Sequence, residues 1–200
     1  MIKTVGLMGG IVFVAAIAAF VGTVATRAEM QASDSVFEDF RTVESIWLYS
    51  DRIGSADATA LERAKSAIAG PLGLSRSEAI YFIANTDNEG RPLRSQCTYR
   101  ITGTAIPARW WSITLYDSET QHYVSNEINR ASWNSEMLPR NPDGQWAMYV
   151  SSTNSGITWL PAPSESDRAF DLMLRVYGPN EQWRSAKGSI GLPIIERLAC

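Results

Sequence analysis

Arg175 and Tyr177 are the side chains of this sequence that are best placed to hold a ligand. They share one face of an expected strand whose other face is apolar. An arginine in a β cavity can hold a carboxylate or a phosphate through two parallel hydrogen bonds. The alternative is that Arg175 pairs with a nearby acid, such as Asp117 or Asp171, and fixes the strand register. We favour the pairing and keep the ligand site as a hypothesis.

Acid–base chemistry has weaker support. Glycoside cleavage needs two carboxylates that flank the scissile bond, and Asp117, Asp143 and Asp171 are the candidates. Asp117 and Asp143 adjoin expected turns, where aspartate has an ordinary local role. The one histidine, His122, lies in a polar segment that we expect to face solvent, and no serine has a nucleophile-elbow context. We assign no catalytic residue and lean towards a protein that is not an enzyme. An unfamiliar hydrolase using Asp117, Asp143 or Arg175 is an alternative.

The composition limits the classes of partner and cofactor. The 200 residues include 18 basic and 21 acidic side chains without a basic cluster, so nucleic acid is not an expected partner. One histidine and two distant cysteines do not have the ligand spacing of a zinc site, and we expect neither metal nor cofactor. Seven tryptophans, seven tyrosines and six phenylalanines indicate a large β core.

The two cysteines are Cys97 and Cys200. In an oxidising compartment an even pair is most simply a disulfide, which here would fix the end of the chain. Two buried free thiols are the alternative.

The first residues of the chain form an apolar segment. Residues 4–26 carry no charge and are long enough to cross a membrane as a helix. We expect residues 1–28 to be an uncleaved anchor, with a cleaved signal peptide as the alternative. Lys3 and the amino terminus favour a cytoplasmic N-terminus, which places the remainder in the periplasm as a single-pass inner-membrane protein. Glycines in this segment could pack against another membrane protein.

The rest of the chain divides into a stalk and a domain. Residues 29–55 are polar with scattered aromatics, and we expect a stalk that leans on the domain. Residues 56–69 predict a helix, for which Thr59 and Glu62 have the spacing of a capping box. From residue 79 onward, alternating apolar runs between turn residues predict an antiparallel β sandwich or jelly roll over residues 56–200.

Five motifs resemble one bacterial family. Residues 111–117 are similar to the central strand signature of the domain-of-unknown-function 1214 family, and residues 126–130, 143–144, 159–163 and 172–179 match in the family's order. The chain resembles the short, membrane-anchored form that lacks the 1254 domain, and both cysteines fall where that form has them. The resemblance covers about residues 56–200 and implies a jelly-roll-like β domain, but no reaction.

Aromatic side chains complete the set of candidates. The prolines after Trp159 hold a rigid loop on which a ligand could rest, although strand aromatics more often pack in the core. We expect a non-catalytic binding role towards an envelope lipid, glycan or protein, with an accessory subunit of a membrane complex as an alternative. The candidate ligand-binding residues are Arg175, Tyr177, Trp111, Trp159 and Arg130.

Overall fold

The computed structural model describes most of the chain, namely residues 2–32, 41–42, 45–50, 54–68, 73–75, 77–164, 167–185 and 191–200. The chain forms two compact units, Met1–Glu38 and Asp39–Cys200. The first unit contains helix α1, Ile2–Ala32, and the second contains the β domain.

Helix α1 has the length and composition of a membrane-spanning helix. Its segment Gly10–Ala28 has a mean hydropathy of 2.0, and none of the residues in this segment is buried within the protein. A helix that belonged to a soluble core would bury one side of its surface. The predicted apolar helix is therefore confirmed, and both a membrane anchor and a signal sequence fit it.

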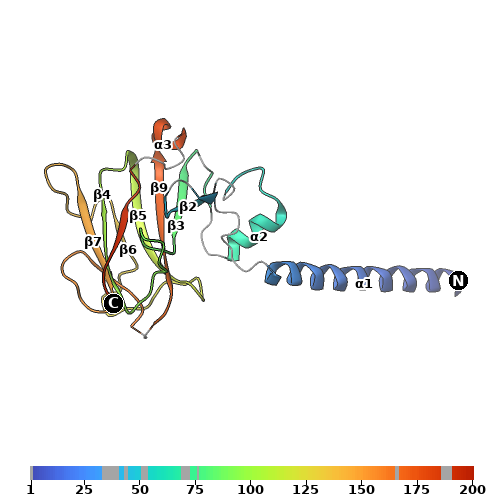
Figure 1. Ribbon diagram of the computed structural model, residues 1–200. Helices are drawn as coiled ribbons and strands as arrows, with labels where there is room; N and C mark the ends of the chain where they lie inside the picture. The colour runs from blue at the N-terminus through green and yellow to red at the C-terminus, as the bar shows by residue number, and fades with distance from the viewer. Residues whose placement is uncertain are drawn as a thin grey trace. The chain divides into compact units, whose positions relative to one another are not determined.

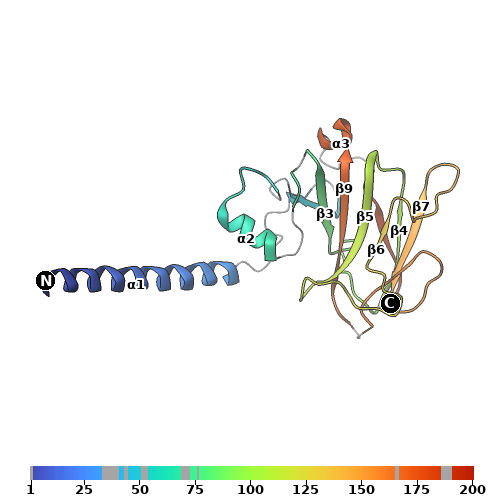
Figure 2. The same ribbon diagram turned by 180° about the vertical axis from the view of Figure 1, so that it is seen from behind.

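The second unit is mainly β, as predicted, and consists of two sheets (Figures 1 and 2). The first sheet has the order β1-β2-β3-β9-β5-β6 and the second has the order β10-β4-β7-β8. The strands are β1 (Arg41–Thr42), β2 (Leu48–Ser50), β3 (Ala79–Ala84), β4 (Thr98–Gly103), β5 (Ala108–Asp117), β6 (Ser132–Asn134), β7 (Trp146–Ser151), β8 (Trp159–Pro161), β9 (Phe170–Pro179) and β10 (Ile194–Ala199). Among the described strands, β7 and β8 pair in parallel and the other neighbouring strands pair antiparallel, so the second sheet is mixed.

The two sheets bury one aromatic face against the other. Trp111 of β5 contacts Trp146 of β7 with ring centroids 4.8 Å apart. Tyr99 of β4 meets Phe170 of β9 edge to face at 5.6 Å. These contacts follow from the alternation of the strands, because every second side chain points between the sheets. The expectation of an aromatic β core is confirmed.

Two helices accompany the sheets. Helix α2, Ala60–Ile68, lies within the predicted segment and begins directly after Thr59, with Glu62 in its first turn. The backbone N–H of Thr59 donates to Glu62 Oε2 at 2.6 Å, and the N–H of Glu62 donates to Thr59 Oγ1 at 3.2 Å. Helix α3, Glu181–Ser185, follows β9 (Figure 1). Its Trp183 is buried in the core.

Residues 45–50, which we expected within a stalk, contribute to the β domain. Strand β2 pairs with β3, and Trp47 and Tyr49 are buried in the core. The indole N–H of Trp47 donates to the carbonyl of Pro193 at 2.7 Å. This segment is therefore part of the packed β domain.

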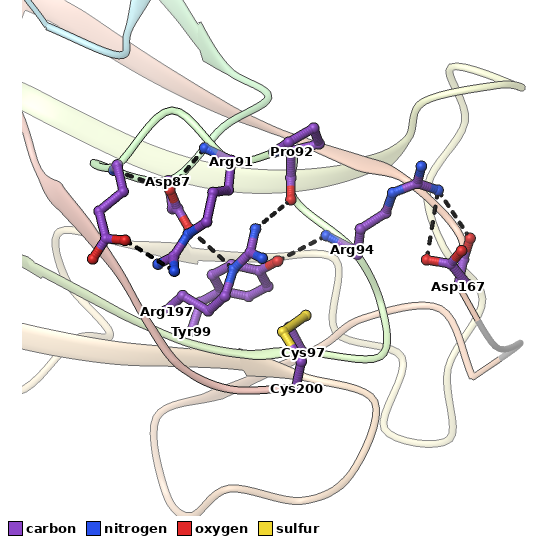
Figure 3. Close-up of a disulfide and its surroundings, with 10 residues drawn as sticks. Asp87, Arg91, Pro92, Arg94, Cys97, Tyr99, Asp167, Arg197 and Cys200 are labelled. Carbon is purple, nitrogen blue, oxygen red and sulfur yellow. Dashed lines mark hydrogen bonds and ion pairs between the residues drawn. A yellow bond between two sulfur atoms is a disulfide. The ribbon is translucent and has the colours of Figure 1, made fainter.

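The C-terminal strand is held at its end by a covalent bond. Cys97 and Cys200 are joined by a disulfide, as predicted, across a sequence separation of 103 residues (Figure 3). Strand β10 pairs with β4 next to this bond, with Ala199 opposite Thr98. The last residues of the chain are therefore part of the second sheet.

Candidate functional site

Strands β9 and β5 place polar side chains on the outer face of the first sheet. In their antiparallel register Arg175 lies opposite Ser112, and Tyr177 lies opposite Trp110. A simple sandwich would leave such a face in water, but Asp171, Met173 and Arg175 are all buried. The alternation of the sequence predicts which residues share this face, and the structure shows that neighbouring segments cover part of it.

Arg175 lies on this covered face, with only 8% of its surface exposed. Its Nη1 atom donates to Thr114 Oγ1 at 2.9 Å, and its Nη2 atom donates to the hydroxyl of Tyr116. The guanidinium carbon also lies 5.4 Å from the centre of the Tyr116 ring. A guanidinium has five N–H donors, so donors remain for a further partner.

The partners of Arg175 carry no charge at neutral pH. Burial and, to a smaller extent, the hydrogen bond with Tyr123 raise the pKa of Tyr116 to about 12, against the opposing effect of Arg175. Burial likewise raises the pKa of Tyr81, which lies opposite Arg175 on β3. Both phenols therefore stay protonated, and neither compensates the arginine as a phenolate.

The expected ion pair of Arg175 is not formed. Asp117 instead lies 2.6 Å from Arg168, and its Oδ1 atom accepts the backbone N–H of Thr120 at 2.8 Å. Asp171 accepts a hydrogen bond from Ser118. Among the described residues no carboxylate lies within ion-pair distance of Arg175, so the favoured interpretation of this residue was wrong. The physical reason is that Arg168, in the loop before β9, forms the ion pair with Asp117 in place of Arg175.

A cleft of about 460 Å³ opens above Arg175. Three hydroxyl side chains, those of Ser112, Thr114 and Ser132, line it. Two aromatic pairs also contribute: Trp110 with Tyr177, at 5.3 Å between ring centroids, and Tyr116 stacked on Tyr123 at 5.0 Å. The remaining lining residues are Gln121 and the exposed His122. The cleft thus combines one buried cation, hydroxyl groups and aromatic surface.

A second cleft of about 750 Å³ lies on the outer face of the other sheet. Its lining includes Arg100, Thr102 and Gln145. Arg100 is exposed there, so water already solvates its charge. Because this arginine is solvated, an ion pair with a bound anion would contribute little binding free energy. The smaller cleft above Arg175 is therefore the better candidate site.

The other ligand-binding candidates lie apart from this cleft. Trp111 lies between the sheets with 1% of its surface exposed. The guanidinium of Arg130 covers the Trp133 ring at 4.0 Å, and the Trp133 indole donates to the carbonyl of Trp159 at 3.0 Å. Arg130 and Trp159 therefore both contact Trp133. Of the other sequence-predicted candidates, Tyr177 alone lines the cleft with Arg175.

Thr114, Tyr116 and Tyr123 are site residues that the sequence analysis did not single out. The alternation of the segment around Trp111 already placed Thr114 and Tyr116 on the polar face of their strand, which is the signal that could have identified them. Tyr123 had no such signal, because it comes from the loop after β5.

The three aspartates considered for acid–base chemistry do not line a common cleft in the described part of the chain. Asp117 and Asp171 are both buried, and neither lines the two clefts described above. Asp143 is exposed in a turn. No group of three or more potential metal-ligating side chains occurs among the residues that the structure describes.

The fold and the site define a class of protein, a two-sheet β domain with a cleft floored by a buried arginine, in a chain that begins with an apolar helix. More particularly, the chain belongs to the family described as "Protein of unknown function (DUF1214)", whose model matches residues 78–181. The family resemblance of the sequence is thereby confirmed. No curated protein matches the chain.

The solved structures that resemble the chain include two bacterial proteins. The VPA0106 protein from Vibrio parahaemolyticus is 26% identical with a TM-score of 0.57, over 71% of this chain. A putative uncharacterized protein from Burkholderia cenocepacia is 20% identical with a TM-score of 0.42, over 60% of this chain. The chain covers 36% and 29% of these two proteins, respectively.

Proposed function

We propose that this protein is a single-pass, membrane-anchored domain that faces the periplasm and binds an envelope ligand without transforming it. The ligand is held in the cleft above Arg175 through an anionic group. The observation that carries this proposal is the burial of a guanidinium whose hydrogen-bond partners, Thr114 and Tyr116, are neutral.

The physical basis is the cost of burying a charge. An ion taken out of water without a counter-charge costs several kcal/mol even after relaxation. Buried charges in proteins are accordingly paired or hydrogen-bonded. Thr114 and Tyr116 meet part of this need, and an anion in the cleft supplies the missing charge. A carboxylate or phosphate matches the planar guanidinium better than other anions do, because it can accept two parallel hydrogen bonds.

A binding role also fits the arrangement of acids better than hydrolysis does. Asp117 binds Arg168 and the turn that follows β5, and Asp171 is buried on the covered outer face of the first sheet. A general acid or base must reach the proton that it transfers. The carboxylates therefore support the structure of the domain rather than chemistry in the cleft.

Anion binding can be tested by thermal unfolding of the full chain in mild detergent, with acetate and inorganic phosphate as probes. We expect at least one probe to raise the Tm of the wild-type protein at constant ionic strength, because a ligand of the folded state stabilises it. Arg175→Met should abolish this rise. Arg100→Met, at an exposed arginine of β4, is the matched control and should retain it. The proposal fails if neither probe raises the wild-type Tm, or if Arg175→Met retains the rise.

The orientation requires a separate experiment. Protease added to spheroplasts should digest the β domain while a cytoplasmic marker protein stays intact. Mass measurement of the purified protein should show residues 1–28 still attached. A protected β domain contradicts the periplasmic placement, and loss of these residues contradicts the anchor.

A further inference from the structure

We infer that the anionic ligand is an acidic sugar, that is, a carboxylate carried on a hydroxylated ring. This inference rests on the proposed anion site at Arg175 and adds the chemical class of its ligand. The evidence for it is the aromatic and hydroxyl side chains of the cleft, which a carboxylate without a ring would not contact.

The aromatic pairs supply surfaces for a ring. The Trp110–Tyr177 pair and the Tyr116–Tyr123 pair both line the cleft. In the register of the strands Trp110 and Tyr116 are separated along β5 by Ser112 and Thr114, so hydroxyl-bearing positions lie between the two pairs. Aromatic faces offer large, rigid contact area to the C–H faces of a sugar ring.

The hydroxyl groups supply partners for the polar edge of such a ring. Ser112 and Thr114 of β5 and Ser132 of β6 lie side by side on paired strands, with Thr114 opposite Ser132. Hydroxyls can both donate and accept hydrogen bonds, as the hydroxyls of a sugar do. A fatty acid would displace water from these hydroxyls without offering them hydrogen bonds in return, which is unfavourable.

The charge of the cleft favours a ligand that carries a single negative charge. Arg175 is the one arginine or lysine among its described lining residues, and two of its donors are already used by Thr114 and Tyr116. A carboxylate is compensated by one guanidinium, whereas a phosphate monoester carries about −1.5 to −2 charges near neutral pH. A carboxylate-bearing ring therefore fits this site better than a sugar phosphate does.

Calorimetric titration of the full chain in mild detergent tests the inference with four probes: glucuronate, glucose, acetate and inorganic phosphate. We expect glucuronate to bind roughly tenfold more tightly than acetate or phosphate, because the ring adds contacts to the same charge interaction. Glucose, which lacks the charge, should bind at least about tenfold more weakly than glucuronate.

Variants separate the contribution of the ring from that of the charge. Trp110→Leu should weaken glucuronate binding about fivefold and change acetate binding less than about twofold, because only the sugar has a ring to contact it. Arg175→Lys should weaken both probes, because lysine lacks the planar fork. Tyr149→Leu, at a half-buried tyrosine of β7 outside the cleft, is the control and should change neither.

The outcomes distinguish this inference from the proposal on which it rests. If acetate or phosphate binds in an Arg175-dependent way and glucuronate binds no more tightly, the sugar assignment is wrong and the anion site stands. Equal weakening of glucuronate and acetate by Trp110→Leu also rejects the sugar assignment. If no probe binds, both the anion site and the sugar assignment are rejected.

Discussion

The carboxylate of Asp87 lies 3.0 Å from Nε of Arg197, which joins the connection between β3 and β4 to the last strand of the chain (Figure 3). Asp87 is 1% exposed and also pairs with Arg91 at 2.9 Å. Its carboxylate further accepts the backbone N–H groups of Glu89 and Arg91 at 3.0 Å. Although burial opposes ionisation, these hydrogen bonds and charges lower the pKa of Asp87.

Removing the charge of Asp87 should destabilise the β domain. We expect Asp87→Asn to lower the free energy of unfolding by about 2–4 kcal/mol, because two arginines lose the charge that compensates them in a partly buried site. Urea unfolding followed by tryptophan fluorescence measures this. The control is Glu89→Gln, which removes an exposed partner of the same Arg91 and should cost less than about 1 kcal/mol. Equal effects of the two substitutions would contradict a special role for the buried carboxylate.

The disulfide should contribute to stability independently of that ion pair. Its loop of 103 residues corresponds to about 4–5 kcal/mol in the chain-entropy model. We expect the double variant Cys97→Ala/Cys200→Ala to lower the unfolding free energy by up to this amount, and a reductant to lower the wild-type value similarly. The reductant should leave the double variant unchanged. A wild-type protein that is insensitive to reductant would show that the bond contributes little.

Asp171 should make the domain less stable as the pH rises from about 4 to 6. Burial raises the pKa of Asp171 to about 6, against an opposing hydrogen bond from Ser118 and with support from the charge of Asp117. The unfolded chain releases this proton near its ordinary value of 3.8, whereas the folded domain retains it until about pH 6. Deprotonation therefore favours the unfolded state within this window.

Substitution of Asp171 by asparagine should remove that dependence. We expect Asp171→Asn to be more stable than wild type at pH 8 by up to about 3 kcal/mol, and similar to it at pH 3.5. Unfolding curves at several pH values measure the difference. Asp143→Asn, in an exposed turn, is the control and should show no such trend. A constant difference between the Asp171 variant and wild type across this range would contradict the prediction.

Arg175→Met should change stability little, within about 1 kcal/mol of wild type without ligand. The variant loses two hydrogen bonds, but it also loses an uncompensated buried charge, and the two effects offset one another. Denaturant unfolding in a buffer without carboxylate or phosphate measures the balance. A loss of more than about 3 kcal/mol, which is typical of breaking a buried ion pair, would identify Arg175 as a structural residue.

Local patterns predicted much of this structure. The apolar segment predicted α1, the spacing of Thr59 and Glu62 predicted the start of α2, and alternating residues predicted the longer strands but not the short strands β1, β2, β6 and β8. The pairing of the two cysteines also followed from their number. These features depend on neighbouring residues or on simple counting, so local patterns were enough to predict the mainly β class, the apolar helix and the disulfide.

The surroundings of each charge were decided only by the tertiary structure. The sequence placed Arg175 and Tyr177 on one strand face and offered Asp117 and Asp171 as partners of the arginine. Asp117 pairs instead with Arg168, which lies far from it in the sequence. Burial of Arg175 depends on segments that cover the sheet, and Tyr123 reaches the cleft through the path of a loop. Electrostatic pairing and burial depend on distances between segments far apart in the chain, which no local pattern of residues specifies.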